Sequence, residues 1–167
     1  MPTIPDWALA LTFWIHFLAA VTLVGSLVAS SVIVLPAAQT LDPPNQLNLI
    51  ATIQKRMEPA LWLSLSLLIV TGLFQMSLNI HYNGFLSVSN QWTIAVLVKH
   101  ILVVALIVVS AVQTWDVFPT IRRLLLRKDK ASQEETLKLQ GRAVWLLRAN
   151  LILAILILGA TAFMRAA

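Results

Sequence analysis

Residues 91–115, QWTIAVLVKHILVVALIVVSAVQTW, decide the fold class of this chain. At a rise of 1.5 Å per residue, about 20 apolar residues cross a hydrocarbon core roughly 30 Å thick, so this run is long enough to span a bilayer. Lys99 and His100 lie inside it. An ionisable side chain at that depth costs roughly 2.5–3.5 kcal/mol, so such residues usually face the interior of a helix bundle and have a function.

The composition extends this prediction to the whole chain. Of the 167 residues, 59% are hydrophobic and 11% are charged, whereas soluble domains contain about 25% charged residues. We therefore expect an all-α integral membrane protein in which residues 1–167 form one transmembrane domain with little outside the bilayer. The chain contains no cysteine, which excludes disulfides, iron–sulfur clusters and thiolate metal sites.

Four long apolar segments predict a bundle of four transmembrane helices with up-down-up-down topology. Pro36 closes the first segment, Pro59 stands at the start of the second, and Pro119 breaks the third. The first segment is too long for the core of a cleavable signal peptide. An amphipathic basic connector precedes the fourth helix, and the predicted ranges are helices 7–35, 59–80, 91–117 and 142–164 with the connector at 121–140.

The distribution of basic residues predicts how the helices are oriented in the membrane. Lys and Arg gather at positions 55–56 and 122–142 and are absent from the N-terminal tail and from residues 81–91. Because cytoplasmic loops carry the excess of positive charge, both termini are expected to be extracytoplasmic. The same pattern accounts for the basic isoelectric point without nucleic acid, and the expected location is the bacterial cytoplasmic (inner) membrane as a multi-pass protein.

Two histidines lie at matched depths in this predicted bundle. His16 follows Trp7 by nine residues, and His100 follows Trp92 by eight, which corresponds to about 13.5 Å and 12 Å along parallel helices. The first and third helices of such a bundle are diagonal partners, about 12–14 Å apart when neighbouring axes are 8–10 Å apart. The pair therefore predicts a haem b site near the outer face, with both imidazoles as axial ligands.

Neighbouring positions are candidates for the same site. Gly72, next to Thr71, removes a side chain where a flat group approaches, and Lys99 is placed to pair with a haem propionate or to reach the outer surface. The competing interpretation is structural, because small residues let transmembrane helices pack closely and a single buried histidine is more often a hydrogen-bonded core residue than a ligand.

Copper is the alternative occupant. Met76 lies about one turn from the histidine level on an antiparallel helix, with Gln75 beside it. His16, His100 and Met76 together form a borderline-to-soft donor set of the kind that copper accepts. Elsewhere, Asp116 and Arg148 are expected to form a structural pair near the inner interface, and Asn150 is expected to hydrogen-bond between helices.

Several short stretches resemble the CopD-like family of copper-resistance membrane proteins. These are WIHFLAAVTLVGSLV around His16, TGLFQ at 71–75, LVKHILVVALIVVSAVQ around Lys99, and LLRANLILAILILGA in the last helix. The layout is also similar to HemJ-type protoporphyrinogen oxidases, whose first-helix histidine and third-helix lysine match His16 and Lys99. This chain has four predicted spans where full CopD proteins have about eight, and its first helix lacks the polar residues that the HemJ-type proteins carry after the histidine.

These observations lead to one expected function with two alternatives. The first expectation is a membrane-embedded b-type haem protein that transfers electrons, and the second is a copper transport or homeostasis protein. A non-catalytic role as an accessory subunit of a larger membrane complex, or as a homo-oligomer, is compatible with either. No intramembrane carboxylate, Ser–His–Asp set or glycine-rich phosphate loop supports hydrolytic chemistry.

Overall fold

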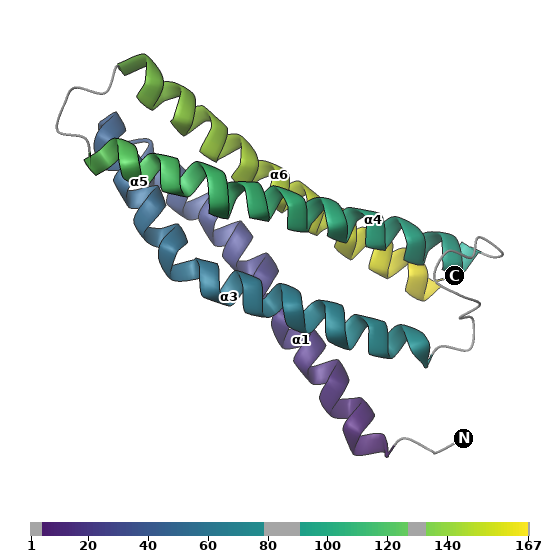
Figure 1. The fold of residues 1–167 in the computed structure, drawn as a ribbon. Coiled ribbons are helices and arrows are strands. Elements are labelled where there is room, and N and C mark those ends of the chain that lie inside the picture. The colour runs from purple at the N-terminus through teal and green to yellow at the C-terminus, as the bar shows by residue number, and fades with distance from the viewer. Residues whose placement is uncertain (1–4, 79–90, 127–132, 167) are drawn as a thin grey trace.

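The computed structural model describes residues 5–78, 91–126 and 133–166, and these are almost entirely helical (Figure 1). Four helices in these ranges, spanning 6–38, 44–77, 91–124 and 134–164, are long and apolar enough to cross a membrane. The elements in chain order are α1 (Asp6–Val28), the π-helical segment η1 (Ala29–Val34), α2 (Leu35–Ala38), α3 (Pro43–Ser77), α4 (Gln91–Val112), the π-helical segment η2 (Gln113–Val117), α5 (Phe118–Leu126) and α6 (Gln133–Ala166).

The helices are longer than predicted, because the prolines do not end them. Pro36 stands in the first turn of α2, and α3 runs through Pro59 without a break. An interior proline removes one hydrogen bond at a cost of about 3 kcal/mol. Burial of the α3 residues before Pro59 offsets this cost, and Leu47, Ile50 and Ala51 are all at most 5% exposed.

The connector predicted at 121–140 is mostly two helix ends. Its first part is the end of α5, its last part is the first two turns of α6, and residues 127–132 lie outside the described residues. Pro119 is the second residue of α5, which follows η2 without a gap, so this proline lies inside one continuous helix that runs from Gln91. The transmembrane helix that begins at Gln91 therefore continues past the predicted stop.

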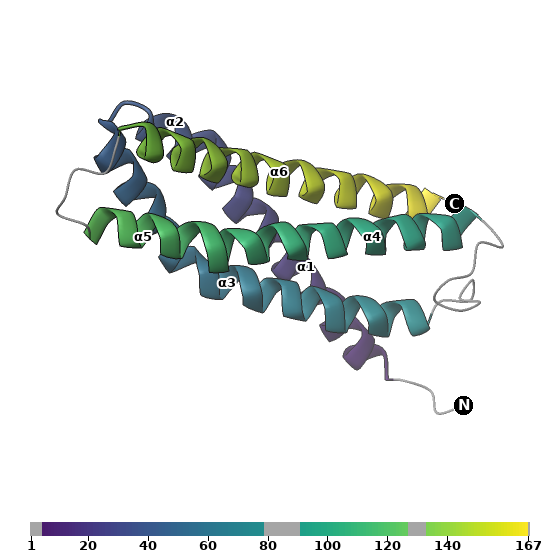
Figure 2. The ribbon, with the colours of Figure 1, turned by 45° about the horizontal axis from the view of Figure 1, so that its top comes forward.

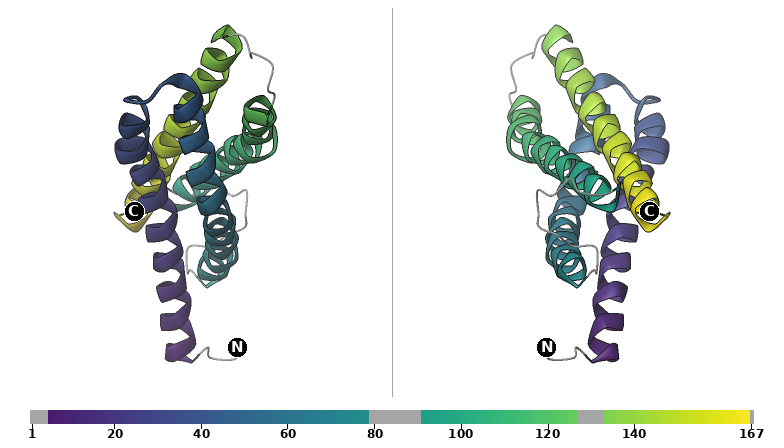
Figure 3. Two further views of the ribbon diagram at one scale, coloured as in Figure 1. Left: turned by 90° about the vertical axis from the view of Figure 1, so that its left-hand side faces the viewer. Right: turned by 90° about the vertical axis from the view of Figure 1, so that its right-hand side faces the viewer.

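The long helices run antiparallel in succession and associate as two pairs (Figures 1 and 2). α1 packs along α3, and α4 packs along α6, with smaller contacts between α1 and α6 and between α3 and α5. Figure 3 shows the N-terminal half of α1 extending away from α4 and α6 with α3 beside it. α1 and α4 do not pack along each other, and neither do α3 and α4.

Two hydrophobic clusters join the pairs. One lies at the end of the bundle where α5 ends and α6 begins, which we call the basic end because it exposes Lys55, Arg56, Arg123, Lys138 and Arg142. This first cluster is centred on Leu35, Leu47 and Ile121. The second cluster lies nearer the middle of the helices and is built from Leu23, Leu27, Leu65, Leu106 and Ala154.

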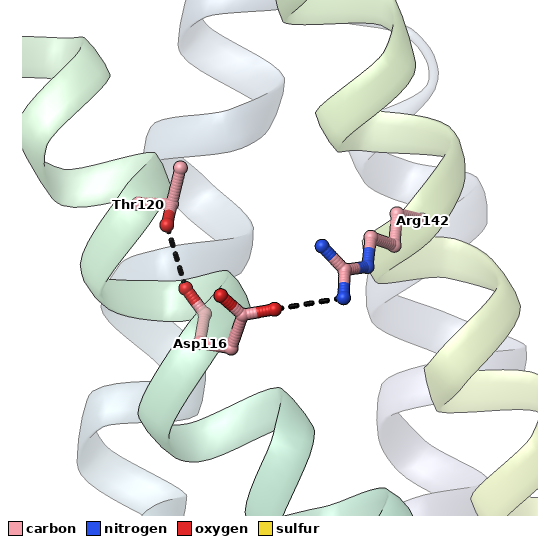
Figure 4. Close-up of polar contacts among 3 residues, drawn as sticks. All are labelled: Asp116, Thr120 and Arg142. Atoms are coloured by element: carbon pink, nitrogen blue, oxygen red, sulfur yellow. Dashed lines mark hydrogen bonds and ion pairs between the residues drawn. The ribbon is translucent and has the colours of Figure 1, made fainter.

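Aromatic and charged contacts support the basic end. The rings of Trp62 and Trp115 stack with centroids 5.4 Å apart, which ties α3 to η2. Asp116 pairs with Arg142 at 2.7 Å, and its backbone carbonyl accepts a hydrogen bond from Thr120 (Figure 4). The prediction that Asp116 pairs with Arg148 is wrong, because α6 presents Arg142 toward η2, and Arg148, six residues on, projects from a different side of the helix.

We expect Asp116→Asn to change stability little. Both side chains of the pair are more than half exposed, and exposed ion pairs contribute about 0–1 kcal/mol. The free energy of unfolding of the detergent-solubilised protein should therefore fall by less than about 1 kcal/mol. The exposed Glu134–Lys138 pair of α6 provides the control, since Glu134→Gln should give an effect of the same small size. A loss of several kcal/mol on Asp116→Asn would contradict the assignment.

Candidate functional site at the α1–α3 interface

His16 lies in the middle of α1 and contacts α3. Its Nδ1 is 2.7 Å from the hydroxyl oxygen of Thr71, which is 7% exposed. The Thr71 hydroxyl donates its own hydrogen to the carbonyl of Leu67, so it accepts a hydrogen bond from His16 Nδ1–H. The neutral imidazole therefore carries its lone pair on Nε2.

Gly72 faces the His16 ring. A Cβ atom built on Gly72 would lie 3.5 Å from His16 Cε1. The sequence predicts that a flat prosthetic group approaches Gly72, and the contact in the structure is with the imidazole of His16. The edge of the ring thus lies against the backbone of α3.

Two further donors follow one turn along α3. Gln75 and Met76 are four residues after Thr71 and Gly72, so they lie on the same faces of the helix. Both are partly buried, and the Nε2 atom of Gln75 has no hydrogen-bond partner among the described residues. By helical spacing, the amide of Gln75 and the thioether of Met76 lie one turn along α3 from the residues that contact the His16 imidazole.

His100 and Lys99 lie on α4, which packs along α6. His100 Nδ1 is 2.7 Å from the carbonyl oxygen of Val96 on the same helix. A carbonyl only accepts, so Nδ1 is protonated and Nε2 carries the lone pair here too. Lys99 is partly buried. Asn79 and His81 lie outside the described residues.

The donors available in the described ranges limit the kind of metal site. No group of three or more His, Asp or Glu residues gathers there to hold a metal ion. A hard cation such as Mg²⁺ or Ca²⁺ prefers several oxygen ligands, carboxylates among them. Imidazole and thioether donors instead favour a softer ion.

Asn150 is the most deeply buried polar residue of α6. It is 0% exposed, accepts a hydrogen bond from Ser110 and donates one to Gln113 at 2.8 Å. Both partners belong to the α4–η2 helix. The prediction that Asn150 hydrogen-bonds between helices is confirmed.

A contact between η1 and α3 was not predicted from the sequence. Ser30 of η1 donates to the Met57 sulfur of α3 at 3.6 Å. The signal in the sequence is the spacing along α3, where Met57, Ser64 and Thr71 recur every seven residues and so return to one helix face. A helix that begins at Pro59 does not contain Met57, so the predicted helix ends conceal this periodicity.

A family model described as copper resistance protein D, CopD, matches residues 51–164. The matched range contains Thr71, Gly72, Met76 and both candidate residues of α4, while His16 precedes it. No curated protein and no solved structure matches the chain. The match covers well over half of a chain that has four membrane-spanning helices, and this multi-pass membrane protein therefore belongs to the CopD family, which is linked to copper resistance.

Proposed function

We propose that this protein handles copper by binding the ion inside the membrane at the α1–α3 interface, with His16 Nε2 and Met76 Sδ as donors. The observation that carries the proposal is the hydrogen bond from His16 Nδ1 to Thr71. Histidines that bind metals usually donate their second ring N–H to a neighbouring acceptor, which fixes the tautomer and orients the ring. Thr71, which holds His16 in this way, lies on α3, the helix that also carries Met76.

The donor chemistry selects the ion. A thioether is a soft ligand that suits Cu(I), and imidazole binds copper readily. The chain has no cysteine, so methionine supplies the only sulfur donors. Copper is here the cargo of the protein, in agreement with the family to which the chain belongs.

Copper loading of the purified protein tests the proposal. The detergent-solubilised chain should retain copper under reducing conditions after desalting, and X-ray absorption should show nitrogen and sulfur in the first coordination shell. Zn²⁺ provides the matched control. Its preference for thioether sulfur is weaker than that of Cu(I), so the protein should retain less Zn²⁺ than copper after the same desalting. Copper lost completely on desalting, or a shell of oxygen alone, would reject this function.

We expect Thr71→Val to weaken copper binding without unfolding the protein. Valine keeps the shape of threonine but cannot accept the His16 N–H, and losing such a supporting partner typically lowers metal affinity about 10–100-fold. Thr71→Ser retains the hydroxyl and should bind copper nearly as well as the wild type. Competition with a Cu(I) chelator measures both affinities, and equal affinities for the Val and Ser variants would contradict the role of the hydrogen bond.

A haem is the second candidate, favoured by one observation. Both His16 and His100 use Nδ1 as a donor, so both direct the lone-pair nitrogen Nε2 elsewhere, as axial ligands do. His16 and His100 would hold the iron, which supplies one-electron redox chemistry when bound. A pyridine haemochrome spectrum distinguishes the two functions, since a haem band lost in either His→Ala variant favours haem over copper.

We further propose that the basic end faces the cytoplasm of a bacterial inner membrane and that both termini face outward. Exposed Lys and Arg side chains at one end of the bundle support this orientation. Large apolar side chains exposed on α1, α4 and α6 are compatible with lipid or with a larger membrane complex. Migration on native gels separates a small isolated species from an assembly.

A further inference from the structure

A groove with a volume of about 260 Å³ lies between α1 and α3. Its lining comes from residues 15–22 of α1 and residues 60–67 of α3, and small side chains such as Ala19 and Ala60 leave it hollow. One water molecule needs roughly 10–15 Å³ of such space. The groove therefore has room for a ring-sized molecule.

The groove has a buried floor and an open side. Ala19 and Ser64 are each 4% exposed and form its floor, whereas Leu18 and Leu63 are 49% and 62% exposed and form its edges. Both helices are long and apolar enough to span a membrane, so the exposed leucines face lipid. A ligand thus enters this groove from the bilayer and not from water.

The groove lies close to the middle of the membrane-spanning segments. Thr22 is the central residue of the span 6–38, and Ser64 is about 5 Å from the centre of the span 44–77. Because the hydrocarbon core is roughly 30 Å thick, water and the ester carbonyls of phospholipids are about 15 Å away from its centre. Neither of them pairs with a polar group at this depth.

Two hydroxyl groups in the lining lack the partner that other helical hydroxyls have. Thr12, Thr120 and Thr161 each donate to the carbonyl oxygen four residues earlier. The hydroxyls of Thr22 and Ser64 make no hydrogen bond to any described residue. An unpaired hydroxyl is costly in an apolar medium, so the groove offers two hydrogen-bond donors to a ligand.

We propose that this groove binds a lipid-soluble carbonyl compound of the quinone type. A carbonyl oxygen accepts a hydrogen bond and brings no donor that needs a partner of its own. One ring carbonyl accepts from Ser64 at the floor and the other from Thr22 on the facing helix, while the apolar tail passes between the exposed leucines into the lipid. A phospholipid acyl chain would fill the same space but leave both hydroxyls unpaired.

The groove is separate from the proposed copper site. Neither His16 nor Thr71 belongs to its lining, and Met76 lies nine residues beyond the last lining residue, Leu67. Quinone binding therefore neither requires copper nor competes with it, and the two sites are tested independently.

Tryptophan fluorescence of the protein in lipid nanodiscs tests the groove, with decylbenzoquinone as the probe and quencher. Ser64→Ala removes only the hydroxyl, and we expect it to raise the dissociation constant of the probe about tenfold, as for the loss of one hydrogen bond. Ser66→Ala is the matched control, because Ser66 lies on the same helix at the same depth but is exposed and outside the lining. It should bind the probe as the wild type does.

A second probe and a second variant complete the test. Decylbenzene keeps the ring and the tail but has no carbonyl, so it should compete with decylbenzoquinone at least about tenfold more weakly than unmodified quinone does. Ala60→Leu should fill the groove and abolish saturable quenching, with helix content checked by circular dichroism.

Three results overturn the inference. Wild-type affinity in Ser64→Ala, or equal competition by decylbenzene, shows a groove that takes any lipid chain. Equal losses in Ser64→Ala and Ser66→Ala place the effect outside the groove. Absence of saturable quenching in the wild type removes the quinone site, while copper retention by the same sample shows that the proposed function stands without it.

Discussion

His16→Ala is expected to abolish high-affinity copper binding, with a loss of affinity of at least about 100-fold. The loss exceeds the 10–100-fold typical for a residue that only supports a ligand, because the substitution removes a donor atom itself. The fold should persist, since His16 is partly buried and the Thr71 hydroxyl keeps its bond to Leu67. Chelator competition gives the affinity, and circular dichroism checks the helix content.

His100→Ala is the matched control for this result. His100 lies on α4, whose packing partner is α6, so its loss should leave copper binding at the α1–α3 interface nearly unchanged. Equal losses from His16→Ala and His100→Ala would contradict a site at that interface and would favour a group shared by both imidazoles. Unchanged binding in His16→Ala would remove His16 from the site altogether.

Gly72→Leu is expected to be nearly as damaging as the loss of His16. An added Cβ would meet His16 Cε1 at 3.5 Å, an ordinary van der Waals contact, so Gly72→Ala should be tolerated. The further carbons of leucine have no such room and would push the imidazole away from Thr71. We expect copper affinity to fall by about 10–100-fold in Gly72→Leu, as for other losses of a ligand's support.

Comparing Gly, Ala and Leu at position 72 shows whether copper affinity falls because the new side chain displaces the His16 imidazole. Gly25 and Gly159 have no atom within 4 Å of an added Cβ, so substitution at either should leave copper affinity unchanged. A graded loss at position 72 alone supports the contact with His16. If Gly72→Leu binds copper as well as Gly72→Ala, the ring is not held where the structure places it.

The sequence predicted the number and type of the helices but not their ends. Long apolar runs identify transmembrane helices unambiguously. A proline, in contrast, ends a helix only when no other interaction offsets the lost hydrogen bond. Here Leu47, Ile50 and Ala51 are buried against α5 and α6, so α3 extends through Pro59 into the first cluster. Burial of this kind depends on neighbouring helices, which periodicity within one helix does not report.

Only part of the candidate site was predicted, because the sequence of one helix does not show which helix packs beside it. His16 was identified as a candidate from its depth, and depth also led to its comparison with His100. Which helix lies beside α1 depends on packing, and the structure places α3 there with Thr71 and Gly72 against the ring. The ion pair of Asp116 shows the same limit, since Arg142 and Arg148 are near each other in sequence and only one reaches the carboxylate.

The π-helical segment η1 changes which residues of the first span face the protein interior, and this matters for homology modelling and redesign of the chain. The buried positions of the first span are Ala19, Leu23, Leu27, Ser30, Leu35 and Ala38, with a step of five residues where η1 lies. A regular α-helical step of three or four residues from Ser30 would instead bury Ile33, which is 67% exposed, or Val34, which is only partly buried. One surplus residue thus turns the last coils of the span by about 100°, and a straight-helix template would aim them at lipid.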